Sequence, residues 1–228
     1  MNIPIIWIIF GVFALLSWLV SLQLKSKFKK FSAIPVNYGL TGKDVALKML
    51  ADSDIYDVKV MSVDGELTDH YNPTNKTVNL SREVYYNNSV AAAAVAAHEC
   101  GHAIQHARAY AWLTMRSSLV PAVSFASKWM QWVLLAGIIL LNTFPQLLLI
   151  GIILFAMTTL FSFITLPVEL NASQRALAWL NNAGITSYST HPQAKSALKW
   201  AAYTYVVAAL SSLATLVYYL YIFLGRRD

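Results

Sequence analysis

The sequence predicts a mainly α-helical membrane protein with about four transmembrane helices and a small polar α+β segment. Three observations lead to this fold class. The 228 residues are 57% hydrophobic and only 12% charged, whereas soluble domains average about 25% charged residues. Long stretches without any charge recur along the chain, and the acidic residues are concentrated before Cys100. Nine glycines, seven prolines and one cysteine exclude a collagen or a disulfide scaffold.

The first apolar stretch, Ile3–Leu24, carries no charge and is long enough to cross a hydrocarbon core of about 30 Å. Four lysines follow it within Lys25–Lys30, and no small-residue cleavage site is present. The stretch therefore predicts an uncleaved anchor with its N-terminus outside and the lysines at cytoplasmic headgroups. This lysine cluster accounts for much of the net charge of +6, and no nucleic-acid-binding signature accompanies it.

Two further crossings are expected in Trp129–Val168, which is 40 uncharged residues long. Such a run makes about 60 Å of helix, enough for two passages with a turn at Asn142–Pro145. We expect the first of these helices to begin near Ser118. Because the pair crosses twice, the segment before it and a loop around Glu169 should lie on the same side of the membrane.

A last crossing is predicted over Trp200–Leu224, which has aromatic residues at both ends. Its orientation is weakly specified, since two lysines on one flank are balanced by Arg226 and Arg227 on the other. The expected organisation is an anchor, a cytoplasmic polar region, a helical hairpin, a second cytoplasmic segment and a final membrane helix, over 1–24, 25–112, 113–168, 169–199 and 200–228.

The polar residues 31–86 predict a small α+β unit. Thr41 followed by Asp44 is typical of a helix N-terminus with an acidic first turn, and this helix should continue to Leu50. Alternating residues and turn signals predict short strands over 57–63, 66–71 and 77–80.

An alanine-rich helix is predicted from Val90 to Ala109, and it carries the sequence His98-Glu99-Cys100-Gly101-His102. Histidines four residues apart are separated by about 40° around a helix, so both imidazoles can bind one zinc ion. Glu99 is offset by about 100° and can take a proton from a water that the zinc polarises. A solvated helix face is the alternative, but the surrounding alanine and valine side chains favour a metal.

A third ligand is suggested by the scarcity of acids. Glu169 is the sole side-chain carboxylate between Cys100 and Arg227. Two histidines and one glutamate form a known catalytic zinc set with an open fourth position. The alternatives are that Glu169 extends to the membrane interface or pairs with Arg175.

Three segments together resemble the YugP-like membrane zinc metallopeptidases: His98–His106, Gly65–Pro73 and Leu166–Ala176. The resemblance implies a zincin-like, gluzincin-type endopeptidase with the zinc ligands at His98, His102 and Glu169. It assigns the general base to Glu99. It also implies that Thr77–Leu80 is an edge strand that pairs with an extended substrate. The layout is also similar to that of the membrane proteases that process prenylated or damaged membrane proteins. In those proteases an aspartate typically follows the glutamate ligand by one turn, where this chain has Ser173.

Three other polar residues have open roles. His70 is a candidate for stabilising the reaction intermediate or for orienting a ligand. Arg175 is a candidate for contacting substrate or Glu169, with interfacial anchoring as the alternative. His106 lies about 12 Å along the helix from His98, too far to share one ion, so a structural role is expected.

The sequence thus predicts a multi-pass zinc endopeptidase of a prokaryotic cell membrane, with its active site on the cytoplasmic side. Its expected cofactor is Zn²⁺, and its expected partners are membrane-associated or extended protein substrates and the lipid bilayer, without nucleic acid. The alternative is a non-catalytic membrane adaptor with a structural metal site. Glu99 favours the enzyme, because a structural site needs no general base. Cleavage within the bilayer is disfavoured, since no acid lies inside a predicted membrane helix.

Overall fold

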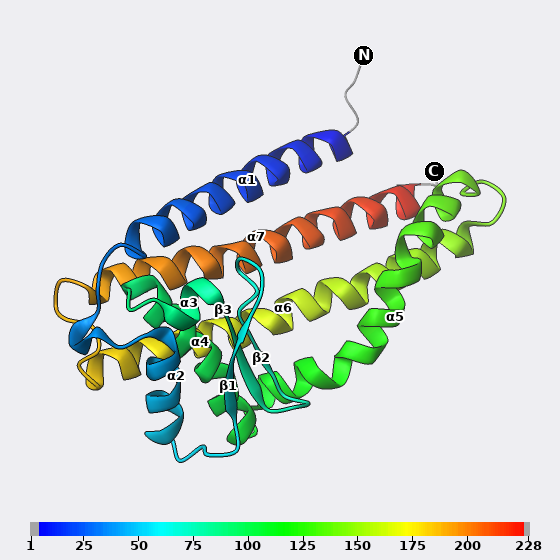
Figure 1. Cartoon of the computed structure of the whole chain (residues 1–228). Helices are drawn as coiled ribbons and strands as arrows, with labels where there is room; N and C mark the ends of the chain where they lie inside the picture. The colour runs from blue at the N-terminus through cyan, green and yellow to red at the C-terminus, as the bar shows by residue number, and fades with distance from the viewer. Residues whose placement is uncertain (1–4, 226–228) are drawn as a thin grey trace. The chain divides into compact units, whose positions relative to one another are not determined.

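The computed structural model describes residues 5–225, and these are mainly helical (Figure 1). In chain order the elements are α1 (Ile5–Phe31), the 3₁₀ turn η1 (Asn37–Gly39), α2 (Gly42–Ala51), β1 (Lys59–Val63), β2 (His70–Asn72), β3 (Thr77–Ser81), α3 (Arg82–Tyr86), α4 (Val90–Ala107), α5 (Ala111–Ile139), α6 (Pro145–Asn182) and α7 (His191–Leu224). Four of the described helices, α1, α5, α6 and α7, are long and apolar enough to cross a membrane. The predicted fold class is confirmed.

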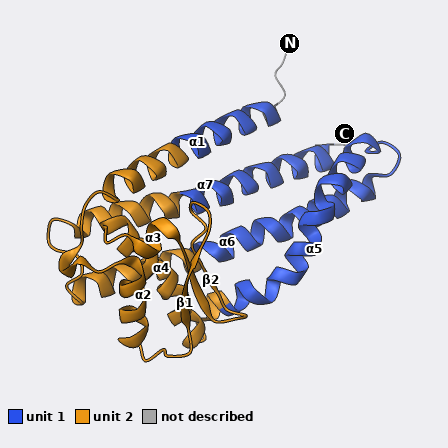
Figure 2. Cartoon of the chain, viewed as in Figure 1, with its two compact units in different colours: residues 1–19, 114–166, 204–228 blue, residues 20–113, 167–203 orange. Residues whose placement is uncertain are grey.

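The chain divides into two compact units (Figure 2). The first comprises residues 1–19, 114–166 and 204–228, and its described part consists of long apolar helices. Within it, α5 and α6 pack closely at Gly137, where an added Cβ would lie 2.5 Å from the Cα of Leu148. The hydroxyls of Thr159 and Ser212 are 2.6 Å apart and join α6 to α7.

The second unit comprises residues 20–113 and 167–203 and contains the sheet. Its strand order is β1-β3-β2, with β1 parallel and β2 antiparallel to β3. All residues of β3 are buried. The expectation that Thr77–Leu80 forms an edge strand is therefore wrong, because strands on both sides cover it. The strand expected over 66–71 is also shorter and later, since it begins only at His70.

Local sequence explains how the helices of this unit begin. The Thr41 side chain accepts a hydrogen bond from the Asp44 amide, and the Asp44 carboxylate accepts one from the Thr41 amide, which confirms the expected helix start. Ser89 caps α4 by accepting from the Ala92 amide. The small side chains at the start of α4 are buried, so the helix lies deep in the core of the unit.

Several helices extend beyond the charge-free runs that predicted them. Helix α1 continues to Phe31, which is buried in the core of the second unit. Helix α6 continues through Pro167 to Asn182, so the loop expected around Glu169 is wrong and Glu169 lies inside a helix. Charged residues mark where a membrane span ends, but they do not end a helix. In α6 the helix continues because the alanine, leucine and glutamine residues after Val168 are good helix formers. Residues 3 and 4, with which the first predicted crossing begins, and Arg226 and Arg227, which follow the last one, lie outside the described residues.

The close contact between α4 and α6 predicts that replacing Gly101 lowers the stability of the protein. A Cβ at Gly101 would lie 2.7 Å from the carbonyl oxygen of Ala172 on α6. We expect Gly101→Ala to destabilise the protein by about 1–3 kcal/mol, measured by thermal unfolding in detergent. Gly11→Ala is the control, since nothing lies within 4 Å of its added Cβ. An equal unfolding temperature for the two variants would contradict the close packing.

Candidate metal centre

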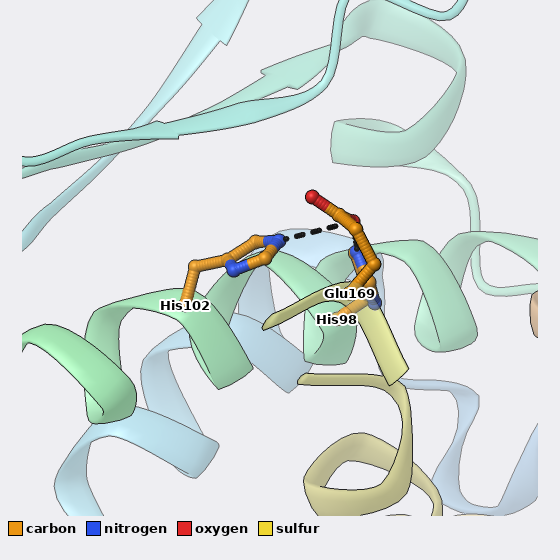
Figure 3. A group of neighbouring side chains, drawn as sticks. All are labelled: His98, His102 and Glu169. Carbon is orange, nitrogen blue, oxygen red and sulfur yellow. Dashed lines mark ion pairs between the residues drawn. The ribbon is translucent and has the colours of Figure 1, made fainter. Parts of the chain in front are cut away.

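Two histidines of α4 and one glutamate of α6 meet in the second unit (Figure 3). His98 and His102 lie one helical turn apart, with ring centroids separated by 4.8 Å. Glu169 directs its carboxylate between them, and one ligand atom from each of the three residues lies within 4.8 Å of the others. Glu169 and His102 are buried and His98 is half-buried. The structure thus brings together the three residues that the sequence suggested as ligands.

The distances between these atoms fit a shared cation. Oε2 of Glu169 is 3.3 Å from Nε2 of His98 and 3.5 Å from Nε2 of His102. Charge-assisted hydrogen bonds are usually shorter, about 2.7–2.9 Å. Ligands at about 2.0–2.1 Å from a tetrahedral zinc are separated by about 3.3–3.4 Å. The donor set and the two distances from Glu169 to the histidines therefore match the requirements of a zinc ion.

Electrostatics couple the histidines to the carboxylate. Burial by itself lowers the pKa of His102, but the hydrogen bond to Glu169 and the charge of Glu99 outweigh it and raise the pKa above its usual value. Without a metal, a proton on His102 is stabilised by the carboxylates around it. A divalent cation can replace that proton, because it supplies the same compensating positive charge.

Each histidine has a hydrogen-bond partner on its other ring nitrogen. Nδ1 of His98 lies 3.1 Å from Oγ of Ser173, and Nδ1 of His102 lies 3.0 Å from Oε1 of Gln105. Partners of this kind fix the ring orientation and keep Nε2 available for a metal. Ser173 is the position at which the sequence comparison with proteases of similar layout led us to expect an aspartate. Both partners in this chain are uncharged oxygens.

Gln105 is the best-connected of these residues, and sequence reasoning missed it. Its side chain is fully buried, and its Nε2 donates to the carbonyl of Val168 at 2.8 Å and to Oδ1 of Asn171 at 3.0 Å. One amide therefore connects His102 on α4 to the backbone immediately before Glu169 on α6. The available signal was its position three residues after His102, on the same face of the helix.

Arg175 belongs to the same network. Its Nε donates to Oδ1 of Asn171 at 2.7 Å, and its guanidinium lies 6.0 Å from the centroid of the Tyr110 ring. Arg175 and Gln105 thus donate to the same oxygen of Asn171, so Arg175 helps to hold the side chain that Gln105 contacts.

Glu99 is held beside the histidines by strand β2. The carboxylate is 8% exposed, and its Oε2 accepts a hydrogen bond from the backbone amide of Tyr71 at 2.9 Å. The phenol oxygen of Tyr71 lies 2.8 Å from Nδ1 of His106. His106 thus joins α4 to β2, in agreement with the expected structural role. No sequence pattern predicts that Tyr71 orients Glu99, because the contact is made by a backbone amide, which every residue except proline has.

His70 has other contacts. Its Nδ1 lies 2.7 Å from the backbone carbonyl oxygen of Thr68, and its Nε2 lies 3.3 Å from the side-chain nitrogen Nδ2 of Asn79. Neighbouring side chains of a strand point to opposite faces, so His70 faces away from the side on which Tyr71 contacts α4. Ser173 and Gln105, rather than His70, contact the ligand histidines.

The Gln105 network predicts a loss of metal affinity when it is broken. We expect Gln105→Leu to lower zinc affinity about 10–100-fold, because His102 loses its orienting partner. Competition with a chelator measures this affinity without any assay of activity. Gln174→Leu is the control, since it makes the same exchange at an exposed position on α6. Unchanged affinity in Gln105→Leu would contradict the orienting role.

Comparison with known proteins agrees with this centre. A family model described as "Putative neutral zinc metallopeptidase" matches residues 6–224. A Bacillus subtilis (strain 168) protein described as "Putative membrane protease YugP" is 42% identical over 213 residues, which cover 93% of this chain and 94% of the relative. No solved structure matches the chain significantly. With the family model spanning nearly all described residues and the membrane helices and ligand cluster present, the chain belongs to this neutral zinc metallopeptidase family.

Proposed function

We propose that the protein is a membrane-embedded zinc endopeptidase. The observation that carries the proposal is the buried Glu99 carboxylate, fixed by a backbone amide beside a three-residue ligand cluster. A structural metal site in a membrane adaptor, the second candidate function, has no use for such a group. An additional buried carboxylate is unfavourable unless it is partnered, so its presence supports a catalytic role.

His98, His102 and Glu169 would hold the zinc and leave its fourth position open. Zinc in such a site would act as a Lewis acid that polarises the substrate carbonyl and lowers the pKa of a bound water to about 7. Ser173 and Gln105 would accept from the Nδ1 groups, which leaves the Nε2 atom of each imidazole free to bind the metal. The chain itself therefore contributes the ligand geometry and the protonation state that metal binding requires.

Glu99 would act as the general base. One of its oxygens is occupied by the Tyr71 amide, so the other oxygen is available to accept a proton from the water that attacks the substrate carbonyl. The C–N bond of the peptide then breaks, and Glu99 passes the proton to the leaving amine. The products are a carboxylate and an amine, so the reaction needs no further cofactor.

Proteins at or near the membrane are the proposed substrates, and we place the site on the cytoplasmic side. Four candidate membrane helices hold the protein in the bilayer, which favours substrates that are also membrane-associated. The lysines that follow the apolar part of α1 favour the cytoplasmic side under the positive-inside rule.

Exchange of the two key carboxylates tests this mechanism. We expect the purified protein to bind about one zinc ion, and Glu99→Gln to retain it while peptide cleavage falls at least about a hundredfold. Glu169→Ala should lose zinc, because a ligand is removed. Asp54→Asn is the control, since Asp54 is an exposed acid outside the ligand cluster. Zinc content by mass spectrometry and cleavage of a labelled protein substrate are measured together.

Two results would contradict the mechanism in different ways. Undiminished cleavage by Glu99→Gln would exclude this residue as the base. Stoichiometric zinc in Glu169→Ala would exclude this residue as a ligand, whatever the activity of the variant.

Cysteine labelling tests the orientation. Cys100 is buried, and burial raises the pKa of its thiol, so it should not react in the folded protein. Tyr188→Cys, at a fully exposed position, should react with a membrane-impermeant maleimide only after the cells are permeabilised. Phe144→Cys, in the turn between α5 and α6, should react in intact cells. The reverse pattern would contradict a cytoplasmic site.

A further inference from the structure

A groove of about 800 Å³ lies in the second unit, separate from the metal centre. It is formed by the last turns of α1, by α3 and by the loop before β2, and it shares no residue with the ligand cluster. Its position along α1 is informative. Leu24, the last residue of the charge-free run, is at one end of the lining, and Lys25 follows it. In a helix that crosses the bilayer, this boundary lies at the depth of the lipid headgroups.

The groove contains charges of both signs that are not paired with each other. Lys25 and Lys29 lie one turn apart on α1, and Glu66 and Glu83 line the same groove. Within residues 5–225, none of these four side chains forms an ion pair; the lysine and arginine pairs there are Lys48–Asp52, Lys76–Asp57 and Arg82–Asp64. Arg82 also lines the groove, but it is paired with Asp64. A ligand with only one sign of charge could pair with either the two lysines or the two glutamates, but not with both. A ligand with both signs can engage all four.

Apolar side chains line the same groove. Leu24 and Phe28 lie one turn apart on α1, next to the two lysines. Across from them, Leu67 and Tyr86 are 53% and 68% exposed. Leu67 has a φ of 56°, in the left-handed region that leucine rarely adopts. Exposed apolar side chains beside charged ones in the same groove favour an amphiphilic ligand, with an apolar part as well as charges.

We propose that this groove binds a membrane phospholipid whose headgroup carries both a phosphate and a primary amine, as in phosphatidylethanolamine. The phosphate would accept hydrogen bonds from Lys25 and Lys29, and the amine would donate to Glu66 and Glu83. The glycerol end would lie against Leu24 and Phe28. The lipid bilayer supplies this ligand directly at the depth of the groove. The proposal does not depend on peptidase activity, so either can fail without the other.

A lipid titration with the full-length protein in detergent tests the lysines. Native mass spectrometry measures binding of phosphatidylethanolamine, phosphatidylglycerol and phosphatidylcholine of equal chain length. We expect the wild-type protein to prefer phosphatidylethanolamine, and the double variant Lys25→Ala/Lys29→Ala to bind it about tenfold more weakly. Lys27→Ala/Lys30→Ala is the matched control, since it removes equal charge from the same helix outside the groove. Equal losses in the two double variants would overturn the proposal.

A second double variant tests the two glutamates of the groove. Glu66→Gln/Glu83→Gln should lose the preference for phosphatidylethanolamine over phosphatidylglycerol, because only the amine requires the carboxylates. Soluble glycerophosphoethanolamine tests the lipid origin, and it should compete at least about tenfold less well than the lipid, since it lacks the acyl chains. Equal binding of all three lipids by the wild type, or equal competition by the soluble headgroup, would overturn the proposal.

Discussion

The buried carboxylate of Glu169 is the constraint around which the second unit is organised. An ionised carboxylate that is 3% exposed is strongly unfavourable unless positive charge lies next to it. The chain supplies two imidazoles from α4 at 3.3 and 3.5 Å, which is wider than an ordinary charged hydrogen bond. This approach is possible because Gly101 lets α4 contact the backbone of α6 at Ala172. A glycine without a direct chemical role therefore determines whether the ligands can meet.

The charges of the centre balance around a divalent cation. Ser173 and Gln105 are neutral acceptors for the histidine Nδ1 groups, so the two imidazoles add no charge when they act as ligands. Glu169 and Glu99 contribute two negative charges, which a Zn²⁺ ion offsets. A carboxylate in the place of Ser173 would make the site more negative. In the proposed enzyme, the neutral partners would leave more of the zinc charge to polarise a bound substrate.

Much of this arrangement could be predicted from the sequence because a few patterns carry geometric information. The four-residue spacing of His98 and His102 fixes a common helix face, and the scarcity of acids after Cys100 singled out Glu169. Gln105 and the Tyr71 amide could not be found in this way, since their contacts depend on tertiary packing between α4, α6 and β2. The position of β3 at the centre of the sheet was also missed, because strand order depends on long-range pairing.

X-ray absorption at the zinc edge tests the central claim most directly, because it reports the atoms around the metal independently of activity. We expect nitrogen and oxygen donors at about 2.0–2.1 Å with the outer-shell scattering of two imidazoles. We also expect His98→Ala, like Glu169→Ala, to lose the bound zinc, because a ligand is removed. A sulfur donor at about 2.3 Å, or a spectrum without two imidazoles, would contradict a centre built from His98, His102 and Glu169.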